Sequence, residues 1–228
     1  MITSRDNEKL KLVRKLHERR WRDKLGLFVA EGEDLVEAAA SVGVEPVELL
    51  VAGGNVEPAL LADVSMLGHP ARIIGVFRSD DLPRGEVPDV GLALWHVGDP
   101  GNVGTLIRAA DALGPAFVAL SPGCADPTGP RALRASMGSV FRVPIVDPDE
   151  APRPWIALVP DGGKPLADVA GVEQTTFLLG AEREGLPAEL VARCDETATI
   201  PLAAGADSLN VAMAGTIALY EHARRNAR

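Results

Sequence analysis

The sequence predicts an α/β protein in which a small α/β unit precedes a larger domain built on a mostly parallel sheet. Short apolar runs without polar alternation recur through the second part of the chain, as expected of strands that are covered on both faces. Segments with helical spacing fill the gaps between these runs. The composition, 46% hydrophobic and 24% charged over 228 residues, allows one or two soluble domains with a sizeable core.

The first part of the chain opens on a basic segment, residues 7–24, in which Leu12, Val13 and Leu16 are spaced for one face of a helix. After it, the pattern predicts a strand, a helix and two further strands, over residues 25–32, 33–43, 47–53 and 71–77. Residues 78–91 are rich in Pro, Gly and Asp and lack apolar periodicity, which marks a domain boundary. We therefore predict an N-terminal domain over residues 1–84 and a second domain over residues 85–228.

Six apolar runs of strand length follow in the second domain, and we expect them to form its sheet. They cover residues 92–97, 117–120, 143–146, 155–159, 176–180 and 197–202. Apolar residues at helical spacing predict one helix over residues 102–114 and a long C-terminal helix over residues 208–225. Between the second and third runs, residues 121–139 form a loop that leads into another helix.

The formal net charge of −9 argues against a nucleic-acid partner, because phosphate contacts normally recruit a basic surface. The charge is unevenly distributed, however. Residues 1–24 hold nine Lys or Arg against four Asp or Glu, so the remaining residues carry −14. Such a basic run is more often a solvated helix face than a binding surface, and charge alone therefore favours the solvated face.

Two further features narrow the class of protein. No apolar run reaches the roughly 18 residues of a membrane span, and the N-terminus lacks the apolar core of a signal peptide. We therefore expect no membrane partner and a cytoplasmic location. Cys124 and Cys194 lie far apart and lack the spacing of a zinc site, so we expect packing residues, no disulfide framework and no bound metal.

A glycine-bearing turn precedes the helix that contains Arg108. It is neither a Walker loop nor a GxGxxG turn followed by an acidic residue, which argues against ordinary nucleotide binding. Gly104 lies one helical turn before Arg108 and leaves a face without a side chain, where a phosphate could approach. The alternative is that Arg108 pairs with Asp111 on a solvated helix face.

Two other polar turns contain Gly180 and Glu182, and Gly205, Ser208 and Asn210. Ligands of open α/β sheets collect at the carboxyl ends of the strands, so these turns and the one before Arg108 could form one crevice. Taken singly, each turn has a simpler explanation. Ser208 or Asn210 could be an N-cap, and Glu182 could be a surface carboxylate.

The three turns carry a resemblance to a known family. Its residues are Asn102, Gly104 and Arg108, then Gly180, Glu182 and Gly185, and finally Ser208, Leu209 and Asn210. In this order they resemble the three motifs of the SpoU (TrmH) class of SPOUT RNA methyltransferases, over residues 92–221. Residues 125–144 resemble the family's loop and helix between the first two motifs. Residues 28–39 resemble the small ribosomal-protein-like substrate-binding domain often fused ahead of the catalytic domain.

The resemblance implies S-adenosylmethionine-dependent methylation of a ribose 2′-hydroxyl in RNA. It also implies a homodimer and a C-terminal SPOUT domain with a deep trefoil knot, which nothing in the periodicity predicts. The cofactor would be held by Leu179, Gly180, Ile200, Leu202, Ser208, Leu209 and Asn210. The residue types suit this role, because Gly180 and Gly205 permit close approach and the aliphatic side chains offer an apolar wall.

The resemblance assigns the central catalytic role to Arg108, which would activate the ribose hydroxyl while it meets an RNA phosphate. Because arginine is almost never deprotonated in proteins, Arg108 could instead anchor the phosphate and stabilise developing alkoxide charge. Asn102 and Ser208 would orient the ribose or the arginine. Glu182 would hold its loop or contact the substrate, and Asn210 would order the cofactor pocket.

Basic residues of both domains are expected to bind RNA: Arg14, Lys15, Arg19, Arg20, Arg22, Arg131 and Arg134. The track would be extended across a dimer by Arg142, Arg224, Arg225 and Arg228. Large-subunit (23S) ribosomal RNA is the favoured substrate, because the extra N-terminal domain is commoner in that branch of the family. The alternatives are a transfer-RNA 2′-O-methyltransferase, a catalytically silent RNA-binding protein, and a dinucleotide-dependent oxidoreductase, which the missing fingerprint disfavours.

Overall fold

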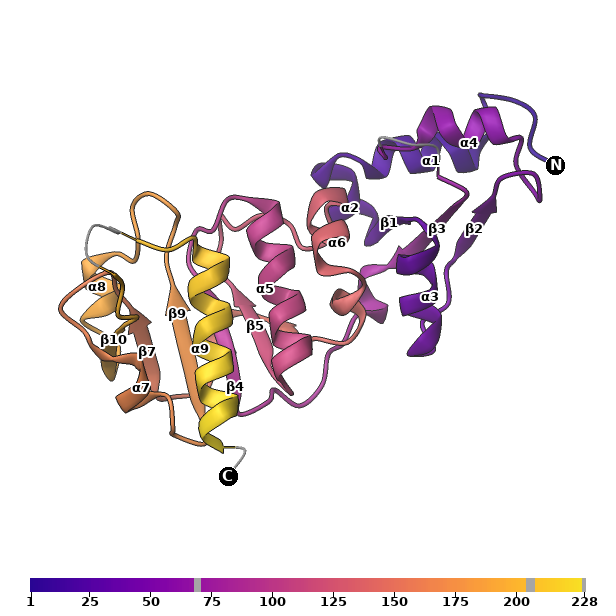
Figure 1. Cartoon of the computed structure of the whole chain (residues 1–228). Coiled ribbons are helices and arrows are strands. Elements are labelled where there is room, and N and C mark those ends of the chain that lie inside the picture. Colours follow the sequence, from indigo (N-terminus) through magenta and orange to yellow (C-terminus); the bar gives the residue numbers. More distant parts are fainter. Residues whose placement is uncertain (68–70, 204–207, 227–228) are drawn as a thin grey trace.

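The computed structural model describes residues 1–67, 71–203 and 208–226, which form two lobes side by side (Figure 1). The N-terminal lobe contains an antiparallel sheet in the order β1-β3-β2. Its strands are β1 (Leu27–Glu31), β2 (Glu48–Val51) and β3 (Ile73–Arg78). Its helices are α1 (Glu8–Leu16), α2 (Arg19–Leu25), α3 (Glu33–Ser41) and α4 (Pro58–Val64). An aliphatic core that includes Leu10, Leu61 and Ile74 lies between α1, α4 and the sheet.

The basic segment forms two helices rather than the one predicted, because the chain breaks between α1 and α2. Glu18 at the break has an extended backbone, with φ −93° and ψ 131°. The Arg22 side chain folds back and donates from Nη1 to the carbonyl oxygens of Leu16 and His17, at 2.8 and 2.9 Å. These carbonyls lie at a helix end, where no intrahelical partner exists, so Arg22 stabilises the break. The buried residues of α1 are Leu10, Val13 and Leu16, with Leu12 half-buried.

The C-terminal lobe contains a seven-stranded sheet in the order β6-β5-β4-β9-β7-β10-β8, and all its pairings are parallel. Its strands are β4 (Val90–Leu94), β5 (Phe117–Leu120), β6 (Ile145–Val146), β7 (Trp155–Leu158), β8 (Lys164–Pro165), β9 (Thr175–Leu179) and β10 (Glu196–Thr199). The predicted fold class is thereby confirmed. The strand β8 overlaps none of the predicted runs, because its two exposed residues, Lys164 and Pro165, form no apolar run. The trefoil knot stays a prediction.

Helices α5 (Pro100–Leu113) and α9 (Val211–Asn226) lie against each other and cover one face of this sheet (Figure 1). Leu92, Leu106 and Phe177 are fully buried in the core beneath them. The helices approach closely, since a Cβ at Gly215 of α9 would overlap the Leu106 side chain of α5. α7 (Leu166–Val169) packs beside α9. On the opposite face, α8 (Ala188–Val191) and Trp155 belong to a separate apolar cluster.

Helix α6 (Pro130–Ser136) packs directly on α5, and Gly104 makes this contact possible. A Cβ at Gly104 would overlap the carbonyl oxygen of Ala132 and lie 2.7 Å from the Cβ of Ala135. The expectation that Gly104 leaves room for a phosphate beside Arg108 is therefore wrong, because α6 fills that space.

The two lobes share an apolar junction. The Phe141 ring of the C-terminal lobe lies 5.9 Å from that of Phe28 and 5.2 Å from that of Phe77, measured between ring centroids. Leu133 and Val140 complete the cluster. The lobes therefore bury part of their apolar surface against each other.

The remaining elements are short 3-10 helices: η1 (Ser79–Asp81), η2 (Ser139–Phe141) and η3 (Pro148–Glu150). Among the helices that the structure describes, none combines the length and the apolar character needed to cross a membrane.

Candidate active site

The three polar turns meet at the carboxyl-terminal edge of the parallel sheet. Asn102 at the start of α5 donates from Nδ2 to Glu182 Oε1 at 2.8 Å, and its Oδ1 accepts from Asn210 Nδ2 at 3.1 Å. Asn102 follows β4, Glu182 follows β9 and Asn210 precedes α9. One chain of hydrogen bonds thus joins segments that lie 80 and 108 residues apart in the sequence.

Glu182 also accepts hydrogen bonds from the backbone. The N–H groups of Gly98 and Asp99 donate to its carboxylate at 3.4 and 3.3 Å. Burial raises the pKa of the Glu182 carboxyl, but the hydrogen bonds from Asn102 and the backbone outweigh it, so the pKa lies below its ordinary value. At neutral pH Glu182 is therefore an ionised acceptor that holds its loop against the start of α5, rather than an isolated surface carboxylate.

This lowered pKa predicts a pH-dependent contribution of Glu182 to folding. The stabilisation is fully present above the unfolded-state pKa and is lost as the pH falls through the lower folded-state pKa. Because Glu182 is exposed and water screens its charge, Glu182→Gln should reduce the free energy of unfolding by less than about 1 kcal/mol at neutral pH, and by progressively less below a pH of about 4. Urea unfolding of both proteins across this range measures the difference. A difference that stays constant with pH would contradict the role of the charge.

Asn210 is both an N-cap and a member of the hydrogen-bond chain. Its Oδ1 accepts from the N–H groups of Ala212 and Met213, at 2.9 and 3.3 Å, in the first turn of α9. Its Nδ2 remains for the bond to Asn102. Ser208, two residues earlier, is exposed. Capping therefore does not prevent Asn210 from ordering the site.

Arg108 lies on the exposed side of α5. The alternative in which it pairs with Asp111 is wrong, because Asp111 bonds Arg142 at 2.6 Å and accepts from the Ser139 hydroxyl at 2.8 Å. Among the described residues, Arg108 has no hydrogen-bond or ion-pair partner. Its guanidinium therefore keeps its donors for a ligand, and their planar geometry suits a phosphate or an oxyanion.

A cavity of about 480 Å³ opens at this edge of the sheet, within the size range of small-molecule sites. The residues predicted to hold the cofactor all line it: Leu179, Gly180, Ile200, Leu202, Ser208, Leu209 and Asn210. Glu182 and Arg183 bring charged groups to its wall. Gly205, the second glycine expected to permit close approach, lies outside the described residues.

Sequence reasoning missed the side of the cavity that lies beyond β7. Leu158, Val159 and Pro160 line it there, and Val211 and Ala214 line it from α9. A signal existed in the sequence, because β7 ends at the same edge of the parallel sheet as β4 and β9, where ligands collect.

Gly180 is required by the tight loop after β9. A Cβ at this position would overlap backbone atoms of Gly185 and Leu186. The N–H of Gly185 donates to the carbonyl oxygen of Ala181 at 2.9 Å, and Gly185 has a φ of +68°, which favours glycine. The loop therefore folds back on itself where it forms one wall of the cavity.

The residues predicted to bind RNA differ in their exposure. Lys15 and Arg20 are exposed and lie 5.2 and 5.6 Å from the ring centroid of Trp21. Arg131 and Arg134 are exposed on α6. These four side chains lie at the surface of the two lobes, although Arg20 also pairs with Glu18 at 2.7 Å and Arg131 lies 3.7 Å from Asp99.

The other predicted RNA-binding residues are engaged within the chain. Arg14 pairs with Asp63 at 2.9 Å, and Arg19 donates to the carbonyl oxygen of Cys124 at 3.4 Å. Arg22 is only 6% exposed and pairs with an aspartate of the other lobe, so its prediction as an RNA-binding residue is wrong. Arg142, Arg224 and Arg225 form ion pairs with Asp111 and Glu221, and Arg228 lies outside the described residues.

The chain places a small-molecule cavity at the carboxyl edge of a parallel sheet, which is the arrangement of a ligand-binding α/β enzyme. Across the described ranges, no three His, Cys, Asp or Glu side chains are placed to hold a metal. Residues 89–220 match the SpoU rRNA Methylase family, and residues 7–77 match the MRM3-like substrate binding domain. The chain belongs to the SpoU rRNA methylase family, which confirms the resemblance of its motifs and excludes the oxidoreductase alternative.

Relatives and solved structures of this family match most or all of the chain. The 23S rRNA (guanosine(2553)-2′-O)-methyltransferase RlmP of Bacillus subtilis is 31% identical over 242 residues, which cover 96% of this chain and 97% of that protein. The 23S rRNA (uridine(2479)-2′-O)-methyltransferase of Streptomyces viridochromogenes is 33% identical over 178 residues, 68% of this chain and 61% of that protein. The AdoMet-bound rRNA methyltransferase of Sinorhizobium meliloti has a TM-score of 0.85 and 31% identity, and the match covers 100% and 98% of the two chains.

Proposed function

We propose that the protein transfers a methyl group from S-adenosylmethionine to a ribose 2′-hydroxyl of 23S ribosomal RNA. The observation that carries the proposal is the hydrogen-bond chain Asn210–Asn102–Glu182, which holds the three motif segments together at the edge of the cavity. The B. subtilis and S. meliloti proteins, which match nearly the whole chain, are both named as rRNA methyltransferases. Ribosomal RNA is therefore favoured over transfer RNA, and this substrate favours the cytoplasmic location expected from the sequence.

The cavity suits S-adenosylmethionine in size and in lining. Ile200, Leu202 and Leu209 would contact the apolar faces of the adenine ring, and Gly180 offers its backbone to close approach. The sulfonium methyl group of the cofactor supplies the electrophile. The residues present therefore fit the cofactor that the family resemblance implies.

Arg108 would anchor the RNA and stabilise the negative charge that develops on the ribose O2′. A neutral ribose hydroxyl is a poor nucleophile, so positioning and stabilisation of the charge that develops on O2′ supply most of the acceleration. The guanidinium stays protonated, and its planar fork can donate to a phosphate oxygen and to O2′ together. Asn102 holds the loop after β9 against the start of α5, and the exposed Ser208 hydroxyl would orient the ribose.

Ribose-methylation mapping of total RNA, from cells with and without the protein, tests this function. We expect a single methylated site to be lost, within 23S ribosomal RNA. A site lost from transfer RNA would overturn the substrate. If no site is lost, the catalytically silent RNA-binding protein becomes the better interpretation.

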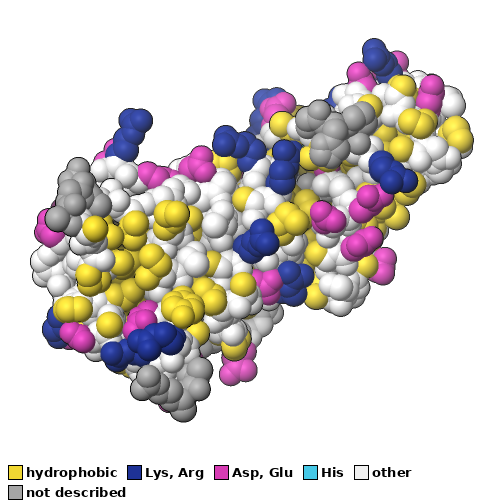
Figure 2. Space-filling view, in the orientation of Figure 1, with side chains coloured by type: hydrophobic (Ala, Val, Ile, Leu, Met, Phe, Trp, Pro, Cys, Tyr) yellow, Lys and Arg dark blue, Asp and Glu magenta, His cyan; other side chains and the backbone are white. Residues whose placement is uncertain are grey.

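We also propose that the protein works as a homodimer. Met213, Ile217 and Tyr220 recur at helical spacing on α9 and are 60%, 37% and 56% exposed. Figure 2 shows hydrophobic side chains gathered over this part of the C-terminal lobe. An exposed apolar stripe supports a protein contact, and a two-fold axis would pair it with itself. Arg108 on the neighbouring α5 is not among the described residues that line its own chain's cavity. Because α5 packs against α9, an interface that extends from α9 onto α5 would bring the exposed Arg108 near the second copy.

Sedimentation at micromolar concentration is expected to give twice the 24.0 kDa mass of the chain. Tyr220→Asp should shift the protein to the monomer, because the two-fold interface would bury two uncompensated carboxylates. The dimer Kd should rise by roughly 100-fold or more. Val42→Asp introduces the same charge at an exposed apolar position of the N-terminal lobe and should leave the dimer intact. A monomeric wild-type protein would count against the dimer.

A further inference from the structure

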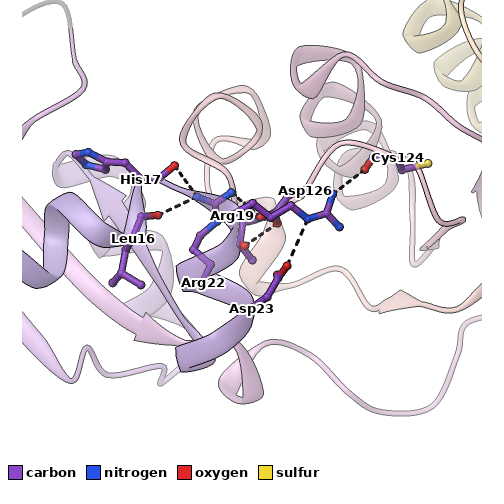
Figure 3. A network of polar contacts seen from close by, with 8 residues as sticks. Leu16, His17, Arg19, Arg22, Asp23, Cys124 and Asp126 are labelled. Carbon is purple, nitrogen blue, oxygen red and sulfur yellow. Dashed lines mark hydrogen bonds and ion pairs between the residues drawn. The ribbon is translucent and has the colours of Figure 1, made fainter.

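A buried ion pair joins the N-terminal lobe to the loop that follows β5 (Figure 3). Arg22 of α2 donates from Nε and Nη2 to Asp126 Oδ2, at 2.8 and 2.6 Å. The Arg22 and Asp126 side chains are 6% and 13% exposed, so salt screens this contact little. Two charge-assisted bonds from one planar guanidinium restrict direction as well as distance.

Each partner of this pair is also anchored in its own lobe. Arg22 Nη1 donates to the carbonyl oxygens of Leu16 and His17 at the end of α1 (Figure 3). Asp126 Oδ1 accepts from the N–H and the hydroxyl of Thr128, at 2.8 and 2.7 Å, just before α6 begins. Neither side chain can rotate away without breaking these bonds. The pair is therefore a rigid link between the end of α1 and the start of α6.

Exposed cations lie on α2 and on α6, the two elements that the link holds together. On the N-terminal side, Arg20 and Lys24 of α2 lie 5.6 and 5.2 Å from the ring centroid of Trp21. On the other side, Arg131 of α6 lies 3.7 Å from Asp99, the residue that caps α5 at the candidate active site. Figure 2 shows Lys and Arg side chains, in dark blue, on the face where the lobes join. The link therefore joins α2, which carries the first cations, to the segment that leads into α6, which carries Arg131.

The apolar junction between the lobes cannot fix their relative orientation by itself, because contacts among Phe28, Phe77 and Phe141 are not directional. We propose that Arg22 and Asp126 are positioning residues, which hold the cations of α2 at a set distance from the candidate active site and so decide which ribose of a bound RNA reaches it. This inference rests on the proposed function.

A double-mutant cycle on RNA affinity tests the link, with protein-free 23S ribosomal RNA as the probe in a filter-binding assay. In the wild-type background, Arg20→Ala removes a cation of α2 and should raise the Kd for RNA about fivefold. In the Arg22→Gln background, Arg20→Ala should raise the Kd for RNA less than about twofold, because α2 is no longer held in a fixed position relative to α6.

Mapping of the methylated product gives a second readout on the same variants. Arg22→Gln should spread methylation from one ribose to its neighbours, with an unchanged affinity for S-adenosylhomocysteine. Asp126→Asn should do the same, and Arg22→Lys, which keeps the charge without the planar fork, should have a smaller effect. Arg84→Gln is the matched control, since it breaks an exposed pair with Asp80 of 2.7 Å and should behave as wild type.

The outcomes separate the inference from the function on which it rests. Equal effects of Arg20→Ala in both backgrounds overturn the inference, as does methylation confined to one ribose in both Arg22→Gln and Asp126→Asn. Loss of S-adenosylhomocysteine affinity in both variants shows general unfolding and also overturns it. If the wild-type protein methylates no RNA, the proposed function fails, and the affinity cycle still decides whether the pair holds the RNA-binding surface in register.

Discussion

Arg108→Ala is expected to lower the single-turnover methylation rate by about 100- to 1,000-fold, with the affinity for S-adenosylhomocysteine nearly unchanged. The rate falls because the guanidinium would stabilise charge that exists only as the new bond forms. The free energy of unfolding should hardly change, since Arg108 has no hydrogen-bond or ion-pair partner among the described residues and Asp111 is bonded to Arg142. Unfolding followed by circular dichroism measures the free energy of unfolding, and calorimetry with S-adenosylhomocysteine measures the affinity.

Two further arginine variants complete this test. Arg108→Lys should restore little activity, because a point-like ammonium cannot reproduce the planar fork that meets a phosphate and O2′ together. Arg193→Ala removes an exposed arginine close to α8 and should keep the wild-type rate. Near-normal turnover by folded Arg108→Ala at saturating cofactor would remove Arg108 from the mechanism.

Gly180→Ala is expected to weaken S-adenosylhomocysteine binding by about 10- to 100-fold. The added Cβ would overlap backbone atoms of Gly185 and Leu186, which cannot rotate aside as a flexible side chain can. Overpacking of this kind costs about 1–3 kcal/mol. If the loop shifts to relieve the overlap, the cavity wall moves with it, and the protein binds S-adenosylhomocysteine less tightly. Each loss of about 1.4 kcal/mol in binding free energy lowers the affinity tenfold.

Gly85→Ala is the matched control for this variant, because a Cβ at Gly85 would have open space around it. Calorimetry should give it the wild-type affinity. Thermal unfolding of Gly180→Ala establishes that the rest of the fold is intact. A folded Gly180→Ala protein that binds S-adenosylhomocysteine as tightly as wild type would show that the cofactor does not depend on this wall of the cavity.

Local sequence patterns determined the sheet and the places of the motif residues. Apolar runs such as residues 117–120 and 176–180 lack polar alternation, which in an α/β protein indicates strands covered on both faces. Parallel strands end at the same edge of a sheet, so polar residues that follow them are brought together. Asn102, Glu182 and Asn210 could therefore be assigned to one site from their positions beside these elements.

The role of Gly104 was decided only by the tertiary structure. In the sequence, a glycine one turn before an arginine indicates open space on the helix. In the folded chain, Ala132 and Ala135 of α6 occupy that space. Helical periodicity reports which face of a helix carries a small residue, but it does not report what packs against that face.

In the basic segment and in the helix that contains Arg108, the partners of the charged side chains likewise could not be predicted from the sequence. Arg20 and Arg22 are alike in sequence, yet Arg22 alone is buried, because Asp126 meets it from 104 residues away. Asp111 lies close to Arg108 along the chain but bonds Arg142, 31 residues further on. Local patterns in the sequence predicted every described strand except β8, the helices α3, α5, α6 and α9, and the motif positions, because these follow from the local backbone and its pattern of burial. Only the tertiary structure decided which charged side chains are paired and which remain for a ligand, because a side chain's partner is set by whichever distant segment packs opposite it.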